Sequence, residues 1–371
     1  MLRGSKRNRQ FDSWAGVPAL NLLATFRRRN SLPAVINKVG LMCSPAMGDT
    51  LLFSGAVQDI RAHFPAQELV HFCMPANLAA AKLVPGIDRQ VTIDLTQALT
   101  TIKAFRAEKL DLMLDFTSWQ KLTALYTMMS GARYTVGFKT AGQHRSRGYD
   151  LSVEHRRDLH EIDNHRSLLH ALKIPTGHTP NITVPEAALP AVLEADEIIV
   201  FHLWPSGVRS WLREWPQERW LELARRLARP ETLFVITGAP SDAERSAAFI
   251  EQMHAIGLHA QFFIGHDGLN TLSRLLQRAD LVVSVNTGVM HLAAIAGAPT
   301  VSINGPNSNR RWGPVGPHAF GVESPGEGCG YLHLGFDSDG KPTDCMQRIS
   351  VDSVFAATEN VRKSQALAES A

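Results

Sequence analysis

The sequence is poor in cysteine and has no C-x-x-C pair. Its four cysteines, Cys43, Cys73, Cys329 and Cys345, stand far apart along 371 residues. This spacing argues against a zinc ribbon, a dithiol redox motif and the disulfide framework of a small secreted domain. A reducing cytoplasm is the simplest compartment, and the sequence assigns no role to Cys329 or Cys345.

Long apolar runs and a strong charge of one sign are also missing. No stretch approaches the roughly 18 apolar residues that a membrane-spanning helix needs, and residues 16–26 do not follow a signal-peptide pattern. The formal net charge is only +3, unlike that of a general nucleic-acid-binding protein. We therefore expect no nucleic-acid partner, and a chain that is soluble or lies on a membrane.

The charge that is present is concentrated at the start. Residues 1–30 hold seven Lys and Arg against one acid, Asp12, so residues 1–32 form a basic amphipathic extension. Pro18 and the leucines after it predict a helix over residues 19–29. Such a helix could lie on anionic lipid or pack on a domain edge with its basic end in water; the sequence leaves both open.

Apolar residues make up 44% of the chain, enough for the cores of about two domains. Residues 35–42 predict a buried strand, 44–49 a turn and 53–64 a helix. Further strands are predicted at 68–74, 91–95 and 110–116, which gives an N-terminal α/β domain over 33–175. The proline-rich segment 176–195 is predicted to be a linker.

A second α/β domain is predicted over 196–350, followed by a C-terminal helix over 351–371. Strands are expected at 197–203, 232–237, 281–285 and 299–303. Helices are expected after Pro216, after a cap at Asn270, and from Thr287-Gly288 to Gly297. Two Rossmann-like halves with parallel sheets would face a central cleft, with ligands outside the carboxyl ends of the strands.

Four sequence blocks identify a family. They are Met-Gly-Asp-Thr at 47–50, the segment from His202 to Trp220, the segment 284–294 (SVNTGVMHLAA) and the segment 304–314. In this order and spacing they resemble glycosyltransferase family 9, the bacterial heptosyltransferases, over residues 33–360. The resemblance implies the GT-B fold, an acceptor site in the first domain and a nucleotide-sugar site in the second. It also implies inverting transfer from a donor such as ADP-heptose, with no essential metal and no cofactor.

Asp49 is the candidate catalytic base. Glycosyl transfer requires a group that removes the proton of the acceptor hydroxyl, and Gly48 lets the acceptor approach closely. In similar heptosyltransferases the aspartate of this Gly-Asp pair is the proposed base. The alternative from the residues alone is an ordinary helix N-cap, a position that aspartate favours.

The departing diphosphate needs oriented N–H donors or positive charge, which the second domain offers. Thr287 and Gly288 open a helix whose first amides form an anion site, and His291 lies one turn further on the same face. Asn286 stands where many relatives have Asp. We interpret this difference as a change in donor preference or activity and not as a dead site, because Asn can still hydrogen-bond ribose or phosphate. A ligand-free strand-to-helix turn with a structural histidine is the alternative.

Other candidates line the same site. Arg213 is expected to clamp the diphosphate, with weaker roles for Ser206 and Arg209, although a solvated loop arginine is the plain alternative. Gly238 is expected in the nucleoside pocket, with Asp242 or Glu244 near ribose.

The basic stretch from Arg133 to Arg147 is expected either to be a solvated loop or to meet an anionic acceptor through Lys139, Arg145 and Arg147. A metal site at Asp337-Ser338-Asp339, or one shared by Cys329, His333 and Cys345, has too little support.

These features predict a cytoplasmic glycosyltransferase, peripheral on the inner face of the inner membrane. It would move heptose from ADP-heptose onto an anionic lipid-linked or core oligosaccharide of lipopolysaccharide. The alternatives are a sugar-nucleotide epimerase or hydrolase, and a non-catalytic nucleotide- or glycan-binding relative. A Rossmann oxidoreductase is disfavoured, because no G-x-G-x-x-G follows the first strand.

Overall fold

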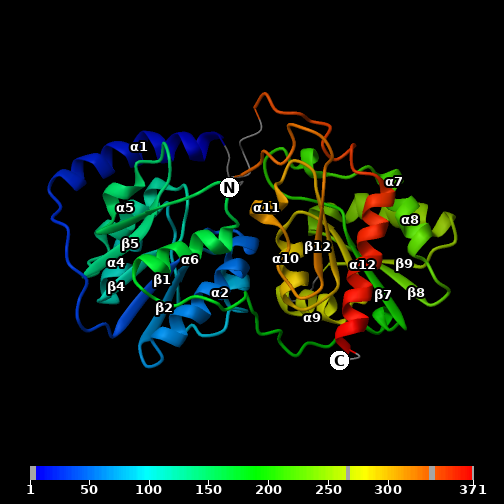
Figure 1. Ribbon diagram of the computed structural model, residues 1–371, viewed down its shortest axis with the longest axis horizontal. Helices are drawn as coiled ribbons and strands as arrows, with labels where there is room; N and C mark the ends of the chain where they lie inside the picture. Colours follow the sequence, from blue (N-terminus) through cyan, green and yellow to red (C-terminus); the bar gives the residue numbers. More distant parts are fainter. Residues whose placement is uncertain (1–5, 265–267, 334–338, 370–371) are drawn as a thin grey trace. The chain divides into compact units, whose positions relative to one another are not determined.

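The computed structural model describes residues 6–264, 268–333 and 339–369. The chain divides into two compact units, one ending at Ile182 and the other beginning at Thr183. This division falls inside segment 176–195, where the linker is predicted. Figure 1 shows a sheet covered by helices in each unit.

The first unit is built on a six-stranded parallel sheet ordered β3-β2-β1-β4-β5-β6. Its strands are β1 Lys38–Met42, β2 Glu68–Cys73, β3 Arg89–Thr92, β4 Leu112–Asp115, β5 Tyr134–Lys139 and β6 Leu151–Glu154. Val39 of β1 is paired with Leu69 on one side and with Leu112 on the other. The strand order reverses between β1 and β4, and ligands of doubly wound sheets bind outside the carboxyl ends at such a point.

Helices cover both faces of this sheet. They are α1 Lys6–Thr25, α2 Met47–His63, α3 Leu78–Ala81, α4 Ala98–Ala107, α5 Lys121–Met129 and α6 Glu161–Ala171, with a short 3₁₀ helix η1 at Arg145–Gly148. Leu41 and Leu114 pack with Phe53 of α2 on one face, while Phe72 packs with Phe105 of α4 on the other. Both faces are buried, which explains why the strands are nearly continuous apolar runs.

The second unit repeats this winding in the order β12-β11-β10-β7-β8-β9. Its strands are β7 Glu197–His202, β8 Thr232–Thr237, β9 Ala260–Phe263, β10 Leu281–Val285, β11 Thr300–Asn304 and β12 Ala319–Glu323. The reversal point lies between β7 and β10. Each unit is therefore Rossmann-like, and the predicted α/β architecture of paired parallel sheets is confirmed.

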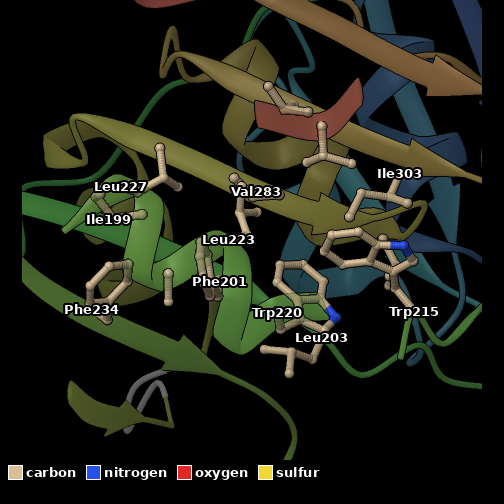
Figure 2. Close-up of a cluster of buried hydrophobic side chains, with 14 of the residues drawn as sticks. Ile199, Phe201, Leu203, Trp215, Trp220, Leu223, Leu227, Phe234, Val283 and Ile303 are labelled. Atoms are coloured by element: carbon tan, nitrogen blue, oxygen red, sulfur yellow. The ribbon is translucent and has the colours of Figure 1, made fainter. Parts of the chain in front are cut away.

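The helices of the second unit enclose an aromatic core. They are α7 Gln217–Leu227, α8 Ala243–Ala255, α9 Leu269–Arg278, α10 Gly288–Ile295, α11 Asn309–Trp312 and α12 Val351–Glu369, with 3₁₀ turns η2 Ala191–Leu193, η3 Ser210–Arg213 and η4 Pro240–Asp242. The Phe201 ring lies 4.9 Å from that of Trp220 and 5.3 Å from that of Phe234 (Figure 2). The core thus anchors the strands that carry the candidate site.

The N-terminal helix differs from its prediction in both bounds. It runs from Lys6 to Thr25 with Pro18 inside it, instead of over 19–29. Asp12 accepts hydrogen bonds from the backbone amides of Lys121 and Leu122 at the start of α5, at 2.9 and 3.0 Å. Leu20 is fully buried against α5. These long-range contacts, on both sides of Pro18, stabilise α1 as one continuous helix. No helix in the described ranges has both the length and the apolar character to cross a bilayer.

Two further predictions are corrected. Gly268, with φ of 71°, is the residue that precedes α9, so Asn270 lies inside the helix and is not its cap. Cys329 and Cys345 form a disulfide, with Cα atoms 5.8 Å apart, although their spacing argued against one. Cys345 packs in one small cluster with Cys329, Tyr331 and Leu332, a contact that separation in the sequence could not reveal.

Candidate functional site

Asp49 lies at the reversal point of the first sheet. It is the third residue of α2, and Ala46 is the N-cap residue, so the alternative that Asp49 caps the helix is wrong. Its residue is only 8% exposed. The positive end of the helix dipole stabilises a carboxylate in this turn. Gly48 precedes it, half-buried, and leaves the backbone without a side chain there.

A buried polar network fixes the start of α2. The amide nitrogen of Asn77 donates to the Thr50 hydroxyl at 2.9 Å, and that hydroxyl donates to the Ala46 carbonyl at 2.9 Å. Burial lowers the pKa of nearby His71 to about 4, so this imidazole is neutral at physiological pH. The two hydrogen bonds of Thr50 thus fix the turn from which α2, and with it Asp49, begins.

His165 of α6 is a buried histidine that the sequence analysis did not single out. Its ring lies 6.1 Å from Phe53 and 5.4 Å from Phe116, measured between ring centroids. Burial lowers the pKa of His165 to about 4, while the charges of Glu161 and Asp49 act in the opposite direction. The signal available in the sequence was the titratable run at 160–165 (HEIDNH), which opens a helix.

The basic stretch from Arg133 to Arg147 does not form one surface. Lys139 is exposed at the carboxyl end of β5, where an acceptor could reach it, whereas Arg133 precedes the same strand and pairs with Asp111. Arg147 is exposed too, but it lines a hollow with Arg27. Arg27 in turn contacts residues at the amino ends of β5 and β6. Arg147 therefore lies near the amino ends of β5 and β6, whereas Asp49 follows the carboxyl end of β1, and its predicted contact with an anionic acceptor stays a prediction.

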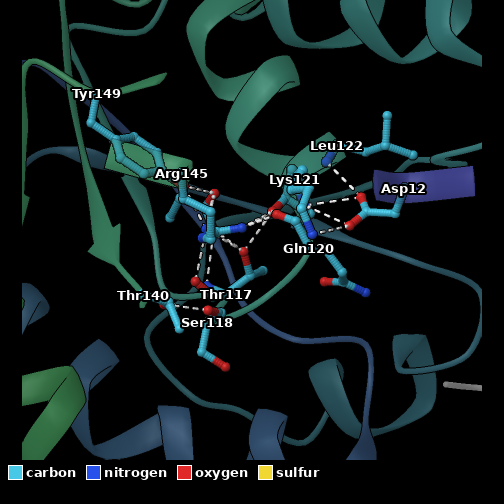
Figure 3. Close-up of polar contacts among 11 residues, drawn as sticks. Asp12, Thr117, Ser118, Gln120, Lys121, Leu122, Thr140, Arg145 and Tyr149 are labelled. Atoms are coloured by element: carbon cyan, nitrogen blue, oxygen red, sulfur yellow. Dashed lines mark hydrogen bonds and ion pairs between the residues drawn. The ribbon is translucent and has the colours of Figure 1, made fainter. Parts of the chain in front are cut away.

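Arg145 is a structural residue, contrary to its predicted role. Its side chain is 0% exposed and pairs with the equally buried Asp115 at 3.0 Å. It also donates to the carbonyls of Thr117 and Gln120 and to the hydroxyl of Tyr149 (Figure 3). Since these partners occupy both terminal nitrogens and the side chain is fully buried, Arg145 holds the loop after β4 and cannot meet an acceptor.

The second unit presents a candidate anion site where β10 leads into α10. Thr287 is the N-cap residue, and its hydroxyl is buried without a hydrogen-bond partner in the described ranges. The first amides of α10 have no carbonyl one turn earlier in the helix to bond, so they are available to an anion. Gly288 lies in this turn, and His291 follows with 4% exposure. The structure thus brings Thr287, Gly288 and His291 together as predicted.

Asn286 faces the protein interior. Its amide nitrogen donates to the side-chain oxygen of Asn304 at 2.9 Å and to the carbonyl of Trp312 at 2.8 Å. Ser302 donates to the same Asn304 oxygen. Both amide hydrogens are used, so Asn286 cannot donate to ribose or phosphate, and an acceptor role of its side-chain oxygen there stays a prediction. These contacts give a structural reason for asparagine at this position.

Two of the three loop candidates after β7 lie together. Arg213, half-buried in η3, donates to the carbonyl of the exposed Ser206. Arg209, with φ of 53°, forms an ion pair with the exposed Asp339 at 2.7 Å, and its weaker predicted role at the phosphate stays a prediction. Asp337 and Ser338 of the D-x-D lie outside the described residues.

A Trp–Arg pair marks the predicted nucleoside pocket beyond β8. Gly238 lies there, and an added Cβ would come within 3.2 Å of the Trp204 ring. The guanidinium of Arg245 stacks on that ring at 4.1 Å and bonds Asp242 at 2.7 Å. Asp242 also accepts from the amide of Ala239, so its carboxylate is engaged within the protein, and its predicted contact with ribose stays a prediction. Trp204 is itself buried in the hydrophobic core of this unit, and its indole nitrogen donates to the Ser246 hydroxyl at 2.8 Å.

No group of three His, Cys, Asp or Glu side chains suited to a metal is found within the described ranges. The disulfide removes Cys329 and Cys345 as thiolate ligands that could join His333, so that alternative is wrong while the disulfide is intact.

Comparisons with known proteins agree with the motifs and the fold. The family model for glycosyltransferase family 9 (heptosyltransferase) matches residues 98–331. The chain is 30% identical over 115 residues to lipopolysaccharide heptosyltransferase 1 of Escherichia coli O18:K1:H7 (strain RS218 / NMEC), which covers 31% of this chain and 34% of the relative. It is 25% identical over 235 residues to the protein of that name from E. coli strain K12, covering 61% of this chain and 70% of the relative.

The fold comparison reaches further along the chain. The solved structure of E. coli heptosyltransferase WaaC with ADP superposes with a TM-score of 0.66 at 20% identity, covering 87% of this chain and 99% of WaaC. With the family model matching well over half of the sequence, the chain belongs to glycosyltransferase family 9, the heptosyltransferase family.

Proposed function

We propose that the protein transfers heptose from ADP-heptose to an anionic core sugar of lipopolysaccharide, with inversion and without an essential metal. The carrying observation is the placement of Asp49 at one reversal point and of the Thr287–Gly288 turn at the other. The names of the relatives support the donor and acceptor classes, since WaaC was solved with ADP and the curated relatives are lipopolysaccharide heptosyltransferases.

In this proposal each unit handles one substrate. Asp49 removes the proton of the acceptor hydroxyl as its oxygen bonds to the anomeric carbon. The bond from that carbon to the diphosphate breaks, and ADP leaves. The amides of the α10 turn, the Thr287 hydroxyl and Arg213 stabilise the charge that develops on the diphosphate.

The acceptor side is proposed to use Lys139, which is exposed at the end of β5. Its ammonium suits a phosphate or ketoacid group on the acceptor. Because such acceptors are linked to lipid, we place the reaction at the inner face of the inner membrane. No cofactor is needed in this chemistry.

The test is to incubate the protein with ADP-heptose and a soluble, delipidated core oligosaccharide. We expect the acceptor mass to rise by one heptosyl unit and ADP to form in equal amount, with no change on adding EDTA. NMR should show an inverted anomeric configuration. Equal consumption of ADP-heptose without acceptor would instead indicate a hydrolase or epimerase, and nucleotide binding with no turnover would indicate a non-catalytic relative.

A further inference from the structure

Helix α1 carries two different faces. Asp12, Gly16 and Leu20 lie four residues apart on one face, and all three are buried against the α5 and η1 region. Asp12 anchors this face, because its carboxylate accepts from two backbone amides of α5 and from the Lys121 ammonium (Figure 3). The helix is therefore fixed to α5, and its opposite face points away from the first unit.

The opposite face is apolar and open to solvent. Trp14, Pro18 and Leu22 are again four residues apart, with Trp14 79% and Leu22 63% exposed. Phe26, 81% exposed, continues the row, because the amides of Phe26 and Arg27 still bond carbonyls three residues earlier. A row of one tryptophan, one phenylalanine and a leucine in water is costly, and the same side chains suit the boundary between headgroups and acyl chains.

Arginines stand where this row ends. Phe26 is followed by the half-buried Arg27 and then by the exposed Arg28 and Arg29. Arg27, Arg29 and Arg147 line a hollow of about 240 Å³, together with Ala24, Thr25 and Tyr149. One nitrogen of Arg27 binds Asp150 at 2.7 Å, whereas Nη1 is buried without a hydrogen-bond partner in the described part of the chain. The hollow thus offers guanidinium donors of a size and charge that suit one phosphate group.

We propose that α1 and residues 26–29 dock the first unit on an anionic phospholipid bilayer. The apolar row would enter the headgroup boundary while the arginine hollow holds one lipid phosphate. Charge complementarity favours a bilayer over a protein partner: Asp12 is the one acid of residues 1–30, and it is buried. This inference rests on the proposed function and deepens it, because it gives an enzyme that acts on a lipid-linked acceptor a surface for binding the membrane.

The test is cosedimentation of the full chain with phosphatidylcholine vesicles and with vesicles containing 30% phosphatidylglycerol. We expect at least tenfold stronger binding to the anionic vesicles, weakened by salt. Arg28→Gln with Arg29→Gln should reduce this binding about 30-fold, since each basic side chain near an anionic surface contributes about 1 kcal/mol, or fivefold. Leu22→Ser with Phe26→Ser should reduce it at least tenfold.

Matched controls replace similar side chains elsewhere in the same unit. Leu99→Ser removes a leucine of α4 that is 77% exposed, and Arg157→Gln removes an exposed arginine. Both should bind vesicles like the natural sequence, and circular dichroism should show all variants folded, because only surface side chains change. The proposal would be overturned if vesicle binding did not depend on lipid charge, or if the controls and the α1 variants lost vesicle binding equally.

A second copy of the chain is the rival occupant of the apolar row. Light scattering that shows a dimer dispersed by Leu22→Ser with Phe26→Ser, without vesicle binding, would also overturn the proposal. Transfer to the delipidated acceptor separates this inference from the proposed function: α1 variants that lose vesicle binding should retain that transfer. Vesicle binding without any transfer would contradict the proposed function and leave the docking surface standing.

Discussion

The side-chain amide of Asn286 donates a hydrogen bond to the side-chain oxygen of Asn304, 2.9 Å away, and so ties the end of β10 to the end of β11. The same nitrogen also bonds the carbonyl of Trp312. The turn that offers its amides to an anion therefore begins from a residue that is fixed on two sides.

Asn286→Asp is expected to destabilise the second unit by about 3 kcal/mol, because a buried carboxylate would face two oxygen acceptors. Urea unfolding measures this change. Asn360→Asp, at an exposed position of α12, should have almost no effect. Equal stability of the two variants would show that the hydrogen bonds donated by Asn286 do not stabilise the fold.

Arg145→Met is expected to cost about 3–5 kcal/mol, because it leaves the buried carboxylate of Asp115 without its cation. Arg133→Met breaks a pair whose arginine side chain is 60% exposed and should cost less than about 1 kcal/mol. Thermal unfolding compares the two. An Arg145 variant of undiminished stability but weakened acceptor binding would restore the role expected from the sequence.

Stability should fall as the pH drops below about 6.5. Burial lowers the pKa of His71, His165 and His202 to about 4, so between pH 6.5 and 4 the unfolded chain binds more protons than the folded chain. Each histidine then contributes a loss of up to about 1.4 kcal/mol per pH unit, absent above pH 6.5. His165→Gln should flatten the slope of unfolding free energy in this range. If NMR showed that His165 titrates with a pKa near 6.5, burial would not lower its pKa and this prediction would be wrong.

Reduction of the disulfide is expected to lower the melting temperature by several degrees. Cys329 and Cys345 are 16 residues apart, and closing a loop of about this length contributes about 3 kcal/mol in the chain-entropy account. Alkylation of the unfolded, unreduced protein should label only Cys43 and Cys73. The double variant Cys329→Ser, Cys345→Ser should melt at one temperature with or without reductant, and reductant sensitivity in that variant would contradict the assignment.

Much of the fold follows from local patterns, and the exceptions have physical causes. Apolar runs located β1, β7 and β10, because strands buried on both faces carry a strong signal. β12 was missed because this edge strand has a glycine and half-exposed residues. Likewise, Pro18 predicts a helix start, and only the contact of Asp12 with α5 explains the longer helix.

Site residues could be predicted only where a sequence motif determines the local backbone conformation, as at a turn from a strand into a helix. The Met-Gly-Asp and Asn-Thr-Gly segments each join a strand to a helix, so Asp49 and Thr287 could be placed from the sequence. The partner of a long side chain could not be placed in this way. Arg145 and Arg147 are two residues apart, yet one is buried against Asp115 while the other is exposed beside Arg27.

The central claim is that the carboxylate of Asp49 takes the acceptor proton, and Asp49→Asn tests it most directly. The exchange keeps the shape of the side chain and removes its basicity. We expect kcat for heptose transfer to fall at least about 100-fold, with the Kd for ADP changed less than about threefold, whereas the exposed Asp158→Asn should leave both unchanged. A variant that keeps more than about a tenth of the rate would contradict the claim.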